Sequence, residues 1–217
     1  MKVTEQCRDA KQLNQLVQVM LAAALTEIRK NRISPLLVET YRPKERQYYL
    51  FGKGRTVRQC TEAGVPQKYA GKYAKPGDAK VTWTLNSIHI QRKAVDLIPL
   101  RKGKAIWNAA DKDTQAIISI MKKYGFEAGA DWKGTPDSAH FQVKGVYKSV
   151  FMAGKANDYV TRVLQKALKK KNYYTGKIDG IWGTATTKAV NQFRKANGWI
   201  PNGKIGKVGL KKLLSLL

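Results

Sequence analysis

The most informative stretch of the sequence runs Ser87-Ile88-His89-Ile90-Gln91-Arg92-Lys93-Ala94-Val95-Asp96. Residues 93–98 are rich in the apolar and β-branched types of a β-strand, and residues 140–143 form a second candidate strand. The chain has only two histidines, His89 before the first strand and His140 at the start of the second, and Asp96 lies within the first strand. Side chains that bind metals or transfer protons are therefore gathered near two predicted strands.

Around this stretch, helices and short strands follow one another in no βαβ order. We predict helices at residues 13–31, from 43 onward and at 109–124, and further strands at 36–41 and 81–84. Residues 52–78 are rich in Gly, Lys and Pro, so we expect irregular, exposed structure there. These elements predict an α+β domain over residues 1–150, with a small antiparallel sheet and flanking helices.

A second, smaller unit is expected over residues 156–217. We predict helices at residues 160–168, 185–196 and 210–217, separated by a Gly-rich turn at 173–183 and a loop at 198–209. This end of the chain, residues 155–217, has 14 Lys and Arg against 2 Asp and Glu. The pattern predicts a small, basic, all-α domain of three helices.

The composition limits the classes of partner. The chain has 217 residues, a formal net charge of +26 and 43% hydrophobic residues, which is enough apolar surface for a folded protein. So high a positive charge favours an anionic partner, either nucleic acid, an anionic membrane or an acidic cell-wall polymer. We expect no specific nucleic-acid binding, because the cations are spread over both halves and accompany no nucleic-acid-binding motif.

The sequence has no apolar run of the roughly 18 residues that a membrane span needs. Its N-terminal apolar segment is interrupted by Gln18 and has helical spacing, so we expect a core helix rather than a signal peptide, and synthesis in the cytoplasm. Cys7 and Cys60 are too few for a disulfide scaffold and lack the spacing of a metal knuckle.

Two imidazoles and one carboxylate make a set of three ligands that leaves a zinc ion one open position for water. His89, Asp96 and His140 are such a set, and Asp137 lies three residues before the last of them. A bound zinc lowers the pKa of its water to about 7, and a second carboxylate nearby can serve as general base.

At these residues the sequence resembles the LAS-type zinc peptidases, which include VanY-like D-alanyl-D-alanine carboxypeptidases and phage L-alanyl-D-glutamate endopeptidases. Their SxHxxGxAxD fingerprint matches residues 87–96, with Arg92 in place of Gly. The resemblance implies that His89, Asp96 and His140 hold one Zn²⁺ and that Asp137 is the catalytic carboxylate. Carboxypeptidase members usually have Glu in that role, so Asp137 resembles the endopeptidase branch more closely.

The same resemblance implies three substrate-binding residues, Arg42, Gln47 and Ser87. The guanidinium of Arg42 suits a substrate carboxylate or a developing oxyanion, because it offers paired donors. Two aromatic side chains, Trp107 and Trp132, are candidates for the walls of a cleft.

The C-terminal unit resembles the peptidoglycan-binding type 1 domains, which are small three-helix modules with a DGxxGxxT turn. That turn matches Asp179, Gly180, Gly183 and Thr186. Asp179 is expected to order its own turn by hydrogen bonds rather than to contact glycan.

The two resemblances together imply a zinc-dependent peptidoglycan peptidase, in the manner of a phage endolysin, that hydrolyses the L-alanyl-D-glutamate bond. Such a protein, expected to be a monomer, would be made in the host cytoplasm and act in the periplasm or cell wall after release. Its charge would favour an anionic envelope surface such as lipopolysaccharide. The alternatives are a D-alanyl-D-alanine carboxypeptidase and, without enzymatic activity, a basic wall-binding or nucleic-acid-binding protein.

Overall fold

The computed structural model describes residues 2–143 and 158–214. The N-terminal part contains the elements η1 (Ala10–Gln12), α1 (Gln15–Lys30), β1 (Ser34–Glu39), α2 (Lys44–Gly52), α3 (Val57–Glu62), α4 (Gln67–Tyr73), β2 (Ala94–Arg101), β3 (Lys104–Ala105), α5 (Lys112–Lys123), β4 (Glu127–Ala128), η2 (Gly129–Asp131) and β5 (His140–Gln142). The C-terminal part contains α6 (Asp158–Lys170), α7 (Thr184–Lys195) and α8 (Lys207–Leu214). The predicted fold class, an α+β domain followed by three helices, is confirmed.

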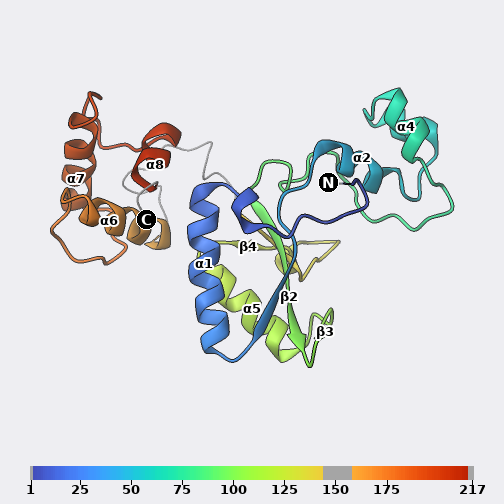
Figure 1. Ribbon diagram of the computed structural model, residues 1–217, viewed down its shortest axis with the longest axis horizontal. Helices are drawn as coiled ribbons and strands as arrows, with labels where there is room; N and C mark the ends of the chain where they lie inside the picture. The colour runs from blue at the N-terminus through green and yellow to red at the C-terminus, as the bar shows by residue number, and fades with distance from the viewer. Residues whose placement is uncertain (1, 144–157, 215–217) are drawn as a thin grey trace.

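The sheet has the strand order β1-β2-β5-β4, with β3 paired to the outer end of β2, and every pairing in it is antiparallel. Helices α1 and α5 pack together and cover one face of this sheet (Figure 1). The amphipathic patterns of these two helices account for that arrangement, because each turns an apolar stripe toward the strands.

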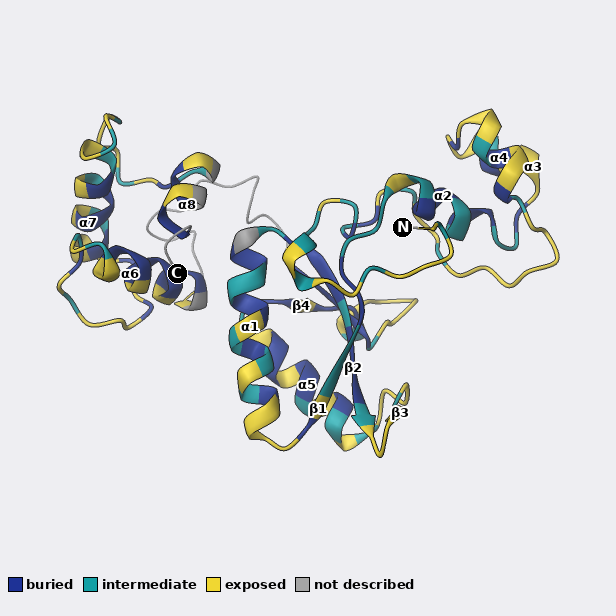
Figure 2. Ribbon diagram, in the orientation of Figure 1, coloured by how far each residue is buried: buried dark blue, intermediate teal, exposed yellow. Residues whose placement is uncertain are grey.

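Alternation along the strands separates a core face from an open face. Val95, Leu97 and Phe141 are fully buried in the core shared with α1 and α5. Their sequence neighbours Asp96 and His140 therefore point to the opposite face of the sheet. Figure 2 shows the result, with the central strands buried and exposure concentrated in the outer turns of the helices and in the loops.

A bulge in β1 alters this alternation close to the open face. Leu37 pairs with Leu97, but the next pair joins Glu39 to Asp96, so that Val38 is the extra residue. A bulge moves the following side chain to the other face of the sheet. The bulge therefore places Glu39 beside Asp96, whereas strict alternation would have placed it among the apolar residues of the core.

Two local predictions are wrong. The segment at residues 52–78 contains two short helices, α3 and α4, whose buried side chains pack in one cluster with Tyr48 and Phe51 of α2. A capping box between Thr56 and Gln59 starts α3. The high content of Gly, Lys and Pro obscured these helices, which are stabilised by their contact with α2 rather than by propensity.

Residues 81–84 form no strand, although their β-branched composition predicted one. Their backbone carbonyls bond to side chains instead of a neighbouring strand: Gln47 donates to the Thr84 oxygen at 2.6 Å and Arg55 to the Thr82 oxygen at 2.9 Å. The segment is thereby held as an extended loop with Trp83 66% exposed.

Arg92 lies at the glycine position of the peptidase fingerprint and has φ of +60°. Left-handed backbone costs an L-residue about 1–2 kcal/mol. Contacts offset that cost, because the Arg92 guanidinium donates to the backbone oxygen and to Oε1 of Gln12, both at 2.8 Å, and lies 3.9 Å from the ring centre of Tyr41. The turn that the fingerprint glycine would form is therefore retained with arginine.

We expect Arg92→Ala to lower the free energy of unfolding by about 1–2 kcal/mol, because it keeps the strained backbone and loses the contacts. Arg92→Gly loses the same contacts but relieves the strain, so it should be about 1 kcal/mol more stable than Arg92→Ala. Urea denaturation of the two variants beside the parent measures both differences. Equal stability of the alanine and glycine variants would contradict the assigned strain.

The C-terminal helices form a small bundle around Leu164, Leu168 and Phe193, all fully buried. Helix α8 also contacts α1, so the apolar cores of the two parts are continuous. The predicted boundary between domains at residues 1–150 and 156–217 lies outside the described residues and stays a prediction. Of the helices in the described ranges, none is both long and apolar enough to cross a membrane.

Candidate metal centre and cleft

Three side chains meet on the open face of the sheet. His89 Nε2 lies 3.1 Å from Asp96 Oδ1 and 3.2 Å from His140 Nδ1, and the last two atoms are 3.1 Å apart. A tetrahedral zinc ion with bonds of 2.0–2.1 Å separates its ligand atoms by about 3.3 Å. The triangle therefore has the dimensions of a binding site for one small divalent cation. Among the described residues, these three side chains form a cluster of potential metal ligands.

The register of the sheet brings two of these ligands together. Asp96 on β2 pairs directly with His140 on β5, so their side chains lie side by side on the same face. His89 comes from the turn that precedes β2. Backbone bonds within the turn, including Arg92 N–H to the His89 oxygen at 3.0 Å, fix its position over the strand.

Each histidine has a partner for its other ring nitrogen. His89 Nδ1 lies 2.8 Å from the Thr40 backbone oxygen, so Nδ1 carries the hydrogen and donates it. Nε2 then keeps the lone pair that can bind a metal. His140 Nε2 lies 3.3 Å from Gln142 Oε1, and Gln142 in turn donates to Glu127 Oε2 at 3.2 Å. These bonds select the tautomers that direct both lone pairs toward Asp96, as outer partners of metal-bound histidines do.

Gln142→Leu should lower metal affinity by about 10–100-fold, because His140 loses the acceptor that fixes its tautomer. Titration calorimetry with Zn²⁺ on the full chain measures this change. Gln115→Leu is the control, since Gln115 is exposed on α5 and its side chain donates to the Ala109 oxygen, away from the candidate metal centre. Unchanged affinity in Gln142→Leu would show that Gln142 does not orient the ligand.

The ionisation of Asp96 favours a cation. Burial acts to raise the pKa of this carboxyl, but the electrostatic effect of His89 and the close contacts of both imidazole rings outweigh it and hold the pKa well below its usual range. Asp96 is therefore a carboxylate at neutral pH, which is the form in which an aspartate can bind a metal.

A buried ion-pair network adjoins the three ligands. Glu39, which is 2% exposed, accepts hydrogen bonds from both Arg42 and Arg46. Arg42 Nη2 also lies 3.8 Å from Asp96 Oδ2. Because two carboxylates face two guanidinium groups, the charges balance and Arg42 is held at the edge of the metal centre. The sequence analysis did not identify Glu39. The feature that could have indicated it is a carboxylate near the end of a predicted strand, three residues before Arg42.

The two polar residues predicted with Arg42 have different positions. Ser87 lines the cleft, and its Oγ lies 3.5 Å from Arg42 Nη1 and accepts from the His89 amide at 3.4 Å. Gln47 is fully buried, and its Oε1 accepts from Arg42 Nη1 at 2.9 Å. Gln47 therefore positions Arg42 and, contrary to the prediction, does not face the cleft.

Asp137 lies in the cleft beside the ligands, as predicted, on the exposed turn that leads into β5. Its Oδ1 accepts from the Ala139 amide at 3.1 Å, and its backbone N–H donates to the Gly129 oxygen at 3.0 Å. A Cβ on Gly129 would lie 2.5 Å from the Asp137 backbone oxygen and 3.1 Å from the His140 Cβ. Gly129, which sequence reasoning missed, is therefore the residue that lets this turn approach the metal centre.

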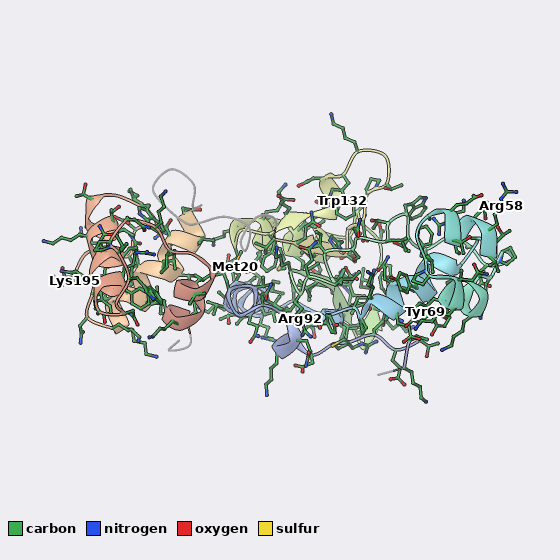
Figure 3. All side chains as sticks on the ribbon, turned by 90° about the horizontal axis from the view of Figure 1, so that it is seen from above. Met20, Arg58, Tyr69, Arg92, Trp132 and Lys195 are labelled. Atoms are coloured by element: carbon green, nitrogen blue, oxygen red, sulfur yellow. The ribbon has the colours of Figure 1, made fainter. Side chains whose placement is uncertain are left out.

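The cleft around these side chains has a volume of about 700 Å³. Its walls include the three ligands, Arg42 and Asp137 together with Trp83, Trp107 and Trp132. Trp107 and Trp132 were predicted there; Trp83 was not, because it was assigned to a strand. Trp132, labelled in Figure 3, packs against His140 with ring centres 4.9 Å apart.

In the C-terminal bundle the signature turn is organised by the buried Gln165. Asp179 Oδ1 accepts from Gln165 Nε2 at 2.8 Å and from the Ile181 amide at 2.9 Å, and these bonds lower the pKa of Asp179. Gly180 has φ of +80°, and a Cβ there would lie 2.8 Å from the Asp158 oxygen. Thr186 Oγ1 lies 3.1 Å from Gln165 Nε2, and Gly183 caps α7. These contacts order the turn, as expected of Asp179.

Two stretches of the chain match known families. Residues 80–143 match the family described as D-alanyl-D-alanine carboxypeptidase, and residues 160–213 match the family described as putative peptidoglycan binding domain. The first stretch contains all three proposed ligands and Asp137. No curated protein sequence matches the chain significantly.

The solved structures that are similar to the chain include two peptidoglycan peptidases. One is the crystal structure of the Serratia marcescens L-Ala D-Glu endopeptidase ChiX, at 20% identity and a TM-score of 0.42, over 64% of this chain and 89% of that one. The other is the LdcB LD-carboxypeptidase, at 18% identity and a TM-score of 0.38, over 60% of this chain and 58% of that one. From the family matches, the chain contains one stretch similar to a peptidase family and, after it, one stretch similar to a peptidoglycan-binding family.

Proposed function

We propose that this chain is a zinc-dependent peptidoglycan peptidase that hydrolyses the L-alanyl-D-glutamate bond of the stem peptides. Its C-terminal part would be the peptidoglycan-binding domain. The observation that carries the proposal is the meeting of His89, Asp96 and His140 at 3.1–3.2 Å, in one cleft with Asp137. When bound to these residues, zinc would polarise the scissile carbonyl and lower the pKa of a water molecule to about 7.

The remaining chemistry belongs to the side chains of the cleft. Asp137 accepts the proton of the attacking water and passes it to the amine that leaves, so the C–N bond breaks without an unstable anionic leaving group. Arg42, held by Glu39 and Gln47, presents a guanidinium edge at the ligands, where it can bind a substrate carboxylate or the oxygen that gains negative charge.

The choice of bond rests on the carboxylate at position 137. Aspartate in that position resembles the endopeptidase branch of the LAS-type peptidases, whereas the carboxypeptidases usually have glutamate. The second candidate is removal of a terminal D-alanine, which the description of the family matched by residues 80–143 favours.

The C-terminal bundle would hold the enzyme on its polymeric substrate. Basic residues are distributed along the whole molecule, as an anionic wall polymer would favour. Arg58 in α3 and Lys195 in α7, for example, lie at opposite ends of the molecule (Figure 3). We propose that the protein acts as a phage endolysin does, made in an infected host and degrading the cell wall after release.

A digest of purified diaminopimelate-type peptidoglycan, with mass-spectrometric assignment of new amino termini, tests the proposal. New D-glutamate amino termini that disappear with a chelator and return with Zn²⁺ are the expected result. Release of free D-alanine would establish the second candidate instead. Binding to the wall without any cleavage would contradict both and leave a wall-binding protein.

A further inference from the structure

Two tryptophans that line the cleft are largely exposed to solvent, although burying their apolar rings would be favourable. Trp83 is 66% and Trp107 is 62% exposed, and both line the same hollow as the metal ligands. They come from separate loops, Trp83 from the extended loop held by Gln47 and Arg55, and Trp107 from the segment after β3. Aromatic side chains that line one cleft are typical of a ligand-binding site.

The other walls of the cleft are rich in hydroxyl groups. Thr82, Thr84, Thr135 and Ser138 line it beside the two indoles. Broad aromatic faces combined with hydroxyl and backbone polar groups suit a ligand that has both C–H faces and many hydroxyls, as a pyranose ring does.

The covalent structure of peptidoglycan connects a sugar to this cleft. The stem peptide begins at a lactyl group on N-acetylmuramic acid, and L-alanine is its first residue. If the bond after L-alanine lies at the metal centre, the sugar is about two residue lengths away, roughly 7 Å. A bond at the D-alanine end lies about three residues further along the peptide, roughly 10 Å more.

We propose that Trp83 and Trp107 form a glycan-binding subsite that stacks on the amino sugars next to the scissile bond. The inference rests on the proposed endopeptidase function and extends it, because it makes the sugar part of the recognised substrate. Binding energy from such a remote group can be used to position the reacting bond, which raises kcat/KM for sugar-bearing substrates.

The test compares two substrates with the zinc-loaded full chain. One is the disaccharide tetrapeptide, and the other is the same tetrapeptide with its L-alanine nitrogen acetylated, which keeps the amide and removes the sugars. We expect kcat/KM for the sugar-bearing substrate to be about tenfold higher or more, and Trp83→Ala or Trp107→Ala to reduce that ratio to about twofold or less. Trp107→Phe should retain most of the ratio.

The control is Ile200→Ala, because Ile200 is 81% exposed on the C-terminal part, outside the cleft lining. Trp132 is left intact because it packs on His140. Equal kcat/KM on both substrates in the parent, with cleavage after L-alanine, would overturn the subsite and leave the proposed function in place.

A second measurement separates failure of the subsite from failure of the enzyme. The five tryptophan indole N–H signals of the full chain are followed by NMR as a peptide-free tetrasaccharide of alternating N-acetylglucosamine and N-acetylmuramic acid is added at millimolar concentration. Shifts of the two signals that are missing in Trp83→Ala and Trp107→Ala support the subsite even if no peptide is hydrolysed. No shift of either signal overturns it.

Discussion

Asp137→Asn is expected to lower kcat on peptidoglycan fragments by about 10²–10⁴-fold while leaving metal binding unchanged. The amide has nearly the shape of the carboxylate and keeps an oxygen for the Ala139 amide, but it cannot accept the proton of the attacking water. The Asp137 side chain accepts from the Ala139 amide, and the bond to a proposed ligand comes from the Asp137 backbone, whose oxygen accepts from the His140 amide at 3.3 Å. Replacing the carboxylate by an amide keeps that backbone bond, so the triangle of ligand atoms should be unaffected. Initial rates and zinc stoichiometry, measured on the same preparation, test both parts.

Two variants sharpen this test. Asp131→Asn is the matched control, since Asp131 lies outside the cleft lining and pairs with Lys122 at 2.8 Å on the surface; its rate should equal that of the parent. Asp137→Glu keeps a carboxylate and should recover part of the activity. If Asp137→Asn hydrolyses its substrate at the parental rate, Asp137 is not the general base.

His140→Ala should abolish both metal binding and turnover. The substitution removes one of the three proposed ligands. The affinity for zinc should therefore fall by more than the roughly 10–100-fold expected when an outer partner such as Gln142 is lost. It also leaves Asp96 with one imidazole in place of two. Zinc content after dialysis and calorimetric titration measure the first effect, and the fragment assay measures the second.

The two variants together distinguish the ligand from the base. Asp137→Asn should bind zinc without turnover, whereas His140→Ala should show neither. A His140→Ala protein that retains one tightly bound zinc would place the metal elsewhere and disprove the ligand set. A lower melting temperature of His140→Ala would neither support nor disprove the ligand set, because the zinc stoichiometry decides the test.

The ligand set is supported by a sheet whose neighbouring strands have fixed positions. One rung across β1, β2 and β5 presents Glu39, Asp96 and His140 in a row on the open face. Glu39 holds Arg42, Asp96 faces both histidines, and Gln142 on the next outward-facing position fixes the His140 tautomer. Residues held by strand pairing keep the positions of a metal site more precisely than residues on loops.

Much of this organisation was predictable from local patterns. Helical spacing of apolar residues predicted α1, α5 and the C-terminal helices, and the two histidines with Asp96 and Asp137 predicted the candidate metal centre. Such patterns are sufficient because a helix, a strand or a ligand motif depends mainly on residues close together in the sequence. Where local signals conflicted, as in the segment that forms α3 and α4, the prediction was wrong.

The tertiary structure alone decided which distant side chains complete the site. The bulge at Val38 brings Glu39 to the open face, the turn of Asp137 needs a glycine at position 129, and packing on α2 stabilises two helices that composition obscured. Trp83 faces the cleft because Gln47 and Arg55 bind the backbone of its loop. Each of these outcomes depends on strand register or on contacts between residues far apart in the chain, and the free energy of such contacts leaves no periodic signal in the sequence.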